Sequence, residues 1–179
     1  MMKNDNKHSS LSRRHFIKTA AAGVALVVSG GAVYCPREAW ALEATSLKPE
    51  TIQTLIKMSR DIYPHDRLSD RYYAVAVKDF DAKAAKDADS KALFENGVTT
   101  LDGLAANSGA ARYVDVAWEA DRLAILRQIE ATPFFAAVRS SLVVGLYNQK
   151  EVWPIFGYEG SSADKGGYIN RGFLDINWL

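Results

Sequence analysis

Apolar residues recur every three or four positions in five segments of the chain, and charged or small residues fill the positions between them. This spacing predicts amphipathic α-helices. The expected helices cover residues 49–63, about 70–88, about 89–106, about 118–129 and 133–146. A proline at the first helical position marks the start of the first and last helices, and Pro64 ends the first.

These segments predict an all-α fold, an irregular bundle of about five helices with a long aromatic and glycine-rich C-terminal tail. Alternating strand-like runs do not separate the helical segments. The bundle is expected to span residues 42–147 as one domain. The helix over 133–146 is the most apolar, so we expect it at the centre, and we expect Asp89 and Ser90 to cap the third helix.

The first 41 residues differ from the rest because they combine paired arginines with a stretch of small and apolar residues. Arg13 and Arg14 are followed two positions later by Phe16, and the run 19–28 is rich in alanine and glycine. This arrangement resembles a twin-arginine export signal. It predicts contact with the twin-arginine translocase and a periplasmic location.

The end of this segment carries a predicted cleavage site. Ala39 and Ala41 supply the small residues of such a site, so the mature chain is expected to begin near Leu42. An uncleaved membrane anchor is the weaker alternative, because the apolar run is interrupted before it reaches about 20 residues. Lipid attachment at Cys35 is disfavoured, since the bulky Tyr34 precedes it.

Residues 148–179 form a tail in which aromatic residues are interleaved with glycines. We expect Trp153 and Phe156 to be core residues that cover the end of the fifth helix. The rest of the tail cannot bury its rings within itself, so it either wraps the bundle or presents aromatic anchors to another protein. The candidate partner-binding residues are Tyr158, Tyr168, Arg171, Phe173 and Trp178.

Charge and composition narrow the possible ligands. The chain has 22 basic and 21 acidic residues, but six of the basic ones lie in the first 41 positions and leave a slightly acidic body. Such a body lacks the basic field that nucleic acid requires, so we expect no nucleic-acid partner. Cys35 is the only cysteine, and His65 is the only histidine after residue 41. We therefore expect this chain to bind no metal, haem or other cofactor itself.

Short motifs extend the interpretation along the whole mature chain. They are the twin-arginine leader, DIYPHD at 61–66, TPFF at 132–135, FGYEG at 156–160 and GGY at 166–168. Together they resemble the gluconate 2-dehydrogenase subunit 3 family. The resemblance implies a non-catalytic small subunit of a periplasmic dehydrogenase that oxidises sugars or polyols. The large subunit, of the glucose-methanol-choline type, would carry FAD, and a cytochrome c subunit often completes such complexes.

The resemblance also accounts for an export signal of this type on a chain without a cofactor site. Twin-arginine transport carries folded proteins, commonly with a cofactor already in place. In the family, the small subunit carries the export signal for a large subunit that lacks one, and the large subunit needs it for maturation. We therefore expect this chain to escort a flavin-containing partner and to stay with it.

Two other functions stay open from the sequence. The first is a small enzyme that uses Tyr63, His65 and Asp66, because a histidine with a pKa near its ordinary value of about 6.5 can act as a general base. The favoured interpretation is that His65 and Asp66 end the first helix and cap the segment after it. The second is a stand-alone periplasmic binding module for a ligand such as a sugar. Its stacking platforms would be Trp118, Trp153 and Trp178.

Adjacent charges on the expected helices carry a prediction about stability. Arg60 lies next to Asp61, and Asp70 lies next to Arg71. We expect both pairs to be solvated, and exposed pairs of this kind contribute little to the free energy of unfolding.

Overall fold

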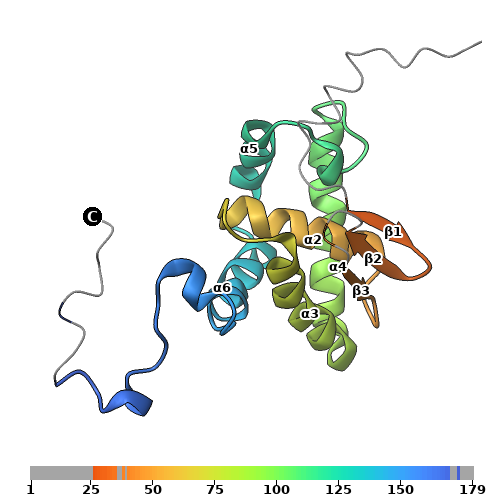
Figure 1. Cartoon of the computed structure of the whole chain (residues 1–179). Helices are drawn as coiled ribbons and strands as arrows, with labels where there is room; N and C mark the ends of the chain where they lie inside the picture. The colour runs from red at the N-terminus through yellow and green to blue at the C-terminus, as the bar shows by residue number, and fades with distance from the viewer. Residues whose placement is uncertain (1–25, 36–37, 39, 170–172, 174–179) are drawn as a thin grey trace, which may run out of the picture.

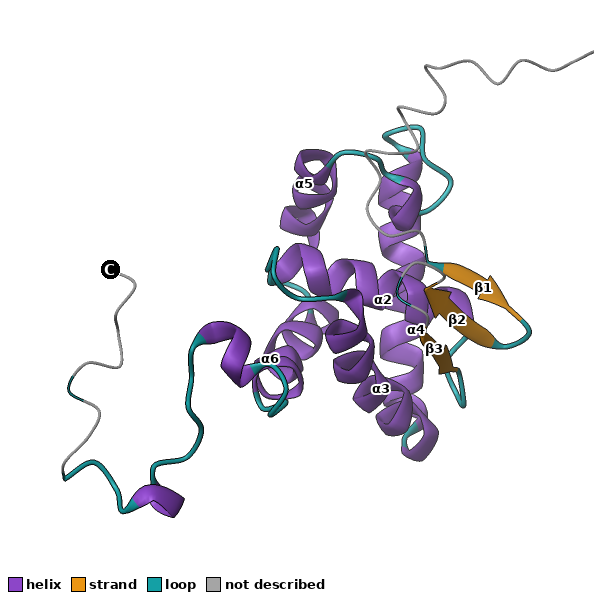
Figure 2. Cartoon of the chain, viewed as in Figure 1, coloured by secondary structure: helices purple, strands orange, loops and turns teal. Residues whose placement is uncertain are grey.

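The computed structural model describes residues 26–35, 38, 40–169 and 173, which form a mostly helical fold with a small sheet on one side (Figures 1 and 2). The α-helices occupy the five ranges that the apolar spacing predicts, so the mostly helical class is confirmed. They are α2 (Pro49–Ile62), α3 (Asp70–Lys86), α4 (Ala88–Ala106), α5 (Glu119–Ile129) and α6 (Pro133–Tyr147). Short 3₁₀ helices lie at Tyr113–Asp115, Trp153–Phe156 and Ala163–Lys165.

Side-chain caps fix where three of the helices begin. Ser69 caps α3 and Thr132 caps α6, each by accepting a hydrogen bond from a backbone N–H in the first turn. The carboxylate of Asp87 caps α4, accepting hydrogen bonds from the N–H groups of Asp89 and Ser90 at 3.3 and 2.9 Å. The prediction that Asp89 and Ser90 themselves cap this helix is wrong, because they already belong to its first turn.

A three-stranded antiparallel sheet is the part of the fold that the all-α prediction missed. Its strands are β1 (Val27–Ser29), β2 (Ala32–Cys35) and β3 (Trp40–Glu43), in the order β1-β2-β3. Gly30 and Gly31, with φ angles of 59° and 86°, form the tight turn between β1 and β2. A pair of glycines between two short runs that contain valine is a hairpin signal. This hairpin signal was not used in the prediction, because the small and apolar residues of the same segment favour an export signal.

The helix α2 lies at the centre of the bundle, and the prediction that the helix over 133–146 is central is wrong. Figure 1 shows α2 crossing between α5 on one side and α3 on the other, with the sheet beyond one of its ends. Nine of its side chains are buried, polar ones included. In contrast, α6 leaves Val143 and Val144 exposed by 50% and 65%. An apolar sequence alone does not show which elements cover a helix, and here the outer face of α6 is uncovered.

Helix length and hydropathy bear on membrane insertion. Among the described residues, no single helix is both long and apolar enough to cross a membrane. The pair formed by α5 and α6 meets the length and composition criteria together, but it is bent by 114°.

Helices α4 and α6 approach each other closely at Gly97, which yields a prediction on stability. A Cβ atom at this position would lie 2.2 Å from Cγ of Phe134. Gly97→Ala should therefore lower the free energy of unfolding by about 1–3 kcal/mol, because the ring must move within a packed core. The matched control is Gly103→Ala in the same helix, where no atom lies within 4 Å and alanine should be neutral or stabilising. Urea denaturation followed by circular dichroism distinguishes them, and equal midpoints would contradict the prediction.

Candidate functional site

Four aromatic and imidazole side chains meet where the loop after α2 contacts the end of α6. We call Tyr63, His65, Tyr147 and Phe156 the His65 cluster. A hydrogen bond of 2.7 Å joins His65 Nε2 to the hydroxyl of Tyr147. The His65 ring lies edge-on to the rings of Tyr147 and Phe156, with centroid distances of 5.6 and 4.9 Å, and Tyr63 contacts Tyr147 at 5.8 Å. The cluster thus joins the α2–α3 loop, α6 and the first turn of the tail.

The surroundings of the hydrogen-bonded pair His65 and Tyr147 favour the neutral form of both side chains near pH 7. Burial, and then the positive charge of Arg60, lower the pKa of His65, while Asp66 acts in the opposite direction. Burial raises the pKa of the Tyr147 hydroxyl. A neutral imidazole hydrogen-bonded to a phenol therefore holds the loop to α6 without a charge at that point.

The lowered pKa of His65 predicts a pH dependence of stability. The folded chain binds the proton less readily than the unfolded chain, whose pKa is near 6.5. The contribution of the neutral His65 side chain to the free energy of unfolding is therefore full above about pH 6.5, and it declines as the pH falls below that value. The effect should stay below about 1 kcal/mol, since the ring is partly exposed to solvent. Urea denaturation of the wild type and of His65→Gln at several pH values isolates it. A difference between them that does not change with pH would contradict the assignment.

The enzyme hypothesis uses Tyr63, His65 and Asp66 together, but the geometry does not place Asp66 against His65. Asp66 is exposed, and among the described residues no hydrogen bond joins its carboxylate to the imidazole. The structure brings Tyr63 into the ring contacts around His65 but not into a hydrogen bond with it. The imidazole therefore has a phenol partner but lacks the orienting carboxylate of a catalytic triad.

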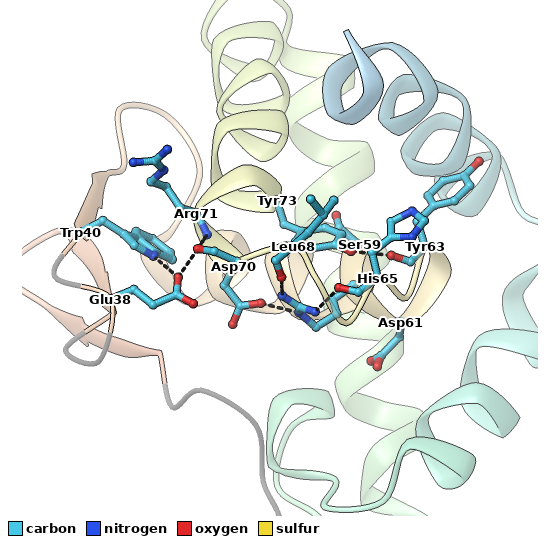
Figure 3. A network of polar contacts seen from close by, with 12 residues as sticks. Glu38, Trp40, Ser59, Asp61, Tyr63, His65, Leu68, Asp70, Arg71 and Tyr73 are labelled. Carbon is cyan, nitrogen blue, oxygen red and sulfur yellow. Dashed lines mark hydrogen bonds and ion pairs between the residues drawn. The ribbon is translucent and has the colours of Figure 1, made fainter. Parts of the chain in front are cut away.

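The guanidinium of Arg60 holds the loop that carries His65. It donates hydrogen bonds to the carbonyl oxygens of His65 and Leu68, at 3.3 and 2.6 Å, and pairs with the carboxylate of Asp70. Figure 3 shows both carbonyls and the Asp70 carboxylate converging on one group. The guanidinium also lies over the Tyr73 ring, 4.6 Å from its centroid. One arginine thus fixes both ends of the loop to α2 and α3.

The predicted solvated pairs are wrong, because the charges pair with other partners and one pair is buried. Arg122 on α5 donates two hydrogen bonds to the Asp61 carboxylate, at 2.8 and 2.9 Å. The side chains of Arg122 and Asp61 are 7% and 3% exposed. The Tyr113 hydroxyl donates a third hydrogen bond to Asp61 at 2.7 Å, and burial raises the pKa of this phenol. Asp70 pairs with Arg60 rather than with Arg71.

The buried pair also explains the position of α5. Arg122 donates hydrogen bonds to the carbonyl oxygens of Val116 and Ala117, at 3.0 and 3.2 Å, and so links the loop before α5 to α2. Sequence spacing could not reveal this, since Asp61 and Arg122 lie far apart along the chain. The only sequence signal was an arginine on the otherwise apolar face of α5.

A pocket of about 360 Å³ opens beside this network, between α2 and the start of α5. Lys57, Arg60, Arg122 and His65 contribute to its wall, and Trp118 stands at its edge with 68% of its surface exposed. Burial, and then the neighbouring charge of Arg122, lower the pKa of Lys57. The polar wall and the exposed ring make this pocket a candidate ligand site beside the predicted residues.

Of the two described tryptophans that were expected to act together, Trp118 borders this pocket and Trp153 does not. Trp153 lies at the base of the tail, where its Nε1–H donates a hydrogen bond to the Tyr147 carbonyl at 2.8 Å. It is half-buried and lies outside the core cluster, and Phe156 is 38% exposed, so the prediction that both are core residues is wrong. Trp178 lies outside the described residues.

The C-terminal tail leaves the bundle after this anchored base. Tyr158 packs edge-on against Trp153 at 5.3 Å. Beyond it, the hydrogen bonds that residues 161–169 make with other described residues stay within the tail, as in the bond from Gly167 N–H to the Ser162 carbonyl at 2.8 Å. Figure 1 shows the tail extending away from α6, on the side opposite the sheet. The described part of the tail, up to residue 169, therefore does not wrap the bundle.

The candidate partner-binding residues that the structure describes are exposed. Tyr158, Tyr168 and Phe173 are exposed by 48%, 60% and 77%. Ile169 is exposed by 83%, and it was not among the residues predicted from the sequence. Its signal was its position beside Tyr168 in a glycine-bounded run. Arg171 lies outside the described residues.

Most export-signal residues also lie outside the described part of the chain. These are Arg13, Arg14, Phe16 and Ala39. Ala41 is described, and it lies in β3, paired with Tyr34 of β2.

Comparisons with known proteins add no assignment. No protein-family model matches the chain, and no curated protein or solved structure is significantly similar to it. Within the described residues, no group of three or more histidine, cysteine, aspartate or glutamate side chains is arranged to hold a metal ion. Functional inference therefore depends on the geometry of this chain and on its sequence motifs.

Proposed function

We propose that this chain is the non-catalytic small subunit and export escort of a periplasmic flavin-dependent sugar or alcohol dehydrogenase. In this proposal FAD belongs to the large partner subunit, and a cytochrome c subunit is a possible third member of the complex. The twin-arginine motif at Arg13 and Arg14 supplies the address for the translocase. The aromatic tail supplies the contact with the partner.

The observation that carries the proposal is the exposure of the tail's large apolar side chains. Tyr158, Tyr168, Ile169 and Phe173 lie outside the bundle core, on a segment that extends from it. Tyrosine and phenylalanine side chains dominate interface energetics when a partner covers them. Contiguous exposed apolar surface marks interaction sites.

The base of the tail is suited to this role because it is fixed to the bundle. Phe156 packs on His65, and Trp153 is hydrogen-bonded to the end of α6. A partner that binds the tail is therefore linked to the bundle through these contacts. Val143 and Val144 lie near the end of α6, a few residues before the tail begins, and their exposed side chains add apolar surface there.

The direct test is affinity purification of the tagged chain from periplasmic extract, followed by mass spectrometry and an absorption spectrum. We expect a larger co-purifying chain with flavin absorption bands. The control is the same chain truncated after Gly157, which should not retain that partner. A lone, colourless protein from both preparations would overturn the proposal.

Replacing Arg13 and Arg14 together with lysine should block export of this chain and of its partner. Lysine keeps the charge but not the guanidinium geometry, and the two residues are not interchangeable in recognition. Cell fractionation and immunoblotting of both proteins measure the effect. The control is Lys18→Arg, which leaves the arginine pair intact. Normal secretion of the partner in the double variant would refute the escort role while leaving complex formation open to the purification test.

A second candidate function is a stand-alone ligand-binding module, favoured by the pocket beside Trp118. The exposed ring lies next to a wall that carries Lys57 and two arginines. Titration with neutral and acidic sugars should quench tryptophan fluorescence in the wild type but not in Trp118→Leu, if this function holds. An unchanged signal in the wild type would exclude these ligands.

A further inference from the structure

The predicted processing site coincides with an element of the folded structure. The bond between Ala41 and Leu42 lies in the middle of β3, which spans Trp40–Glu43. In the ladder with β2, Ala41 pairs with Tyr34 and Leu42 pairs with Val33. A protease binds its substrate as an extended strand that pairs with the enzyme. A peptide bond already held in a sheet is therefore a poor substrate.

Side-chain burial secures the sheet to the bundle. β2 is the middle strand, and its Val33 and Cys35 are 0% and 1% exposed. Val33 belongs to the same core cluster as residues of α2, including Ile52 and Ile56. Peeling β3 away from β2 alone breaks one ladder, whereas removing the whole sheet exposes this part of the core.

Polar contacts add anchors on both sides of the sheet. The Gln53 side-chain amide on α2 donates a hydrogen bond to the Leu26 carbonyl, just before β1. The Glu38 carboxylate accepts a hydrogen bond of 2.9 Å from Trp40 Nε1 (Figure 3). It also accepts a hydrogen bond from the hydroxyl of Ser69, the residue before α3. The sheet is thus fixed to two helices.

The chain after the predicted cut is clamped as well. The Asp81 carboxylate on α3 accepts hydrogen bonds from the backbone N–H groups of Thr45, Ser46 and Leu47, at 2.8, 2.9 and 2.7 Å. Burial opposes ionisation of Asp81, but the hydrogen bond from the Thr45 hydroxyl and those from the three backbone N–H groups lower its pKa, so it stays charged at neutral pH. The bond after Ala41 therefore lies inside a docked sheet and a few residues before a clamped turn.

We propose that the β1–β3 sheet protects the Ala41–Leu42 bond from the processing protease until strands β1 and β2 are withdrawn from α2. Hydrolysis of that peptide bond then consumes one water and releases residues 1–41 from a chain that starts at Leu42. This inference rests on the export signal of the proposed function. It predicts that signal removal occurs only after the strands have been pulled away from α2. A folded precursor in the cytoplasm therefore keeps its export signal.

The test compares cleavage rates of the full-length chain by purified signal peptidase in detergent, with fragments identified by mass spectrometry. A synthetic peptide of residues 30–50 is the unfolded reference. We expect the folded chain to be cut at least tenfold more slowly than the peptide. Gln53→Ala, which leaves the signal sequence untouched, and Val33→Ser, which weakens the buried face of β2, should each accelerate cleavage. Tyr34→Ser, on the exposed face of the same strand, and Gln128→Ala on α5 are the matched controls.

Each outcome of this experiment decides a separate point. Equal cleavage rates for the peptide and the folded chain would overturn the proposed protection by the sheet, but would not contradict the export signal. A peptide that is not cut after Ala41 would overturn both the proposed protection by the sheet and the predicted processing site. Slow cleavage that neither Gln53→Ala nor Val33→Ser accelerates, with helical circular dichroism retained, would show that the sheet is not the cause.

Discussion

Asp61→Ala should lower the free energy of unfolding by about 3–5 kcal/mol, the largest stability effect expected of a single substitution in this chain. The substitution leaves the Arg122 guanidinium buried without its carboxylate, and the Tyr113 hydroxyl loses the acceptor of its 2.7 Å hydrogen bond. An unpaired buried charge is costly because neither water nor a counter-charge can stabilise it. Urea denaturation followed by circular dichroism measures the change.

Two controls separate this effect from a general loss of charge. Asp66→Ala removes an exposed carboxylate five positions away and should change the free energy of unfolding by less than about 0.5 kcal/mol. Tyr113→Phe keeps the ion pair and removes only the hydroxyl, so we expect a loss of about 1–2 kcal/mol. An Asp61→Ala protein within about 1 kcal/mol of the wild type would mean that Arg122 finds another partner or reaches water.

The helices were predictable from the sequence because their information is local. Apolar spacing and the prolines at positions 49 and 133 locate α2 and α6, and the structure places both starts at these residues. The sheet was missed because the same apolar residues fit two patterns. Val33 and Cys35 alternate with Tyr34 as a strand, yet they also continue the small, apolar run that resembles an export signal.

The buried ion pair was not predictable because it depends on how helices cross. Asp61 lies next to Arg60 in the sequence, which suggests an exposed ion pair between these two residues. The apolar and aromatic residues after Asp61 give no sign of a distant partner. Only the packing of α5 against α2 brings Arg122 to it. Similarly, the apolar composition of α6 predicted burial, but the helix has more apolar surface than its neighbours cover. The uncovered apolar surface of α6 around Val144 is of the kind that a partner protein can cover.

Replacing both Tyr168 and Phe173 with serine should weaken binding of the proposed partner by about a thousandfold, since each interface hot spot contributes about 2 kcal/mol or more. Their rings are exposed by 60% and 77%, and the described tail beyond residue 160 makes its hydrogen bonds within itself. The bundle should therefore keep its helical circular dichroism and melting temperature. Titration of the purified large subunit by surface plasmon resonance or calorimetry measures the affinity.

The matched control for this pair is Val75→Ser on α3, an apolar residue exposed by 48% on a helix rather than on the tail. It should leave the affinity within about threefold of the wild type, because a scattered exposed apolar residue is ordinary surface. Unchanged binding by the double variant would move the partner contact from the tail to another face. The uncovered side of α6 is then the next candidate, tested by Val143→Ser with Val144→Ser. Loss of helical signal in the double variant would instead make the tail part of the fold, in conflict with its extension away from α6 (Figure 1).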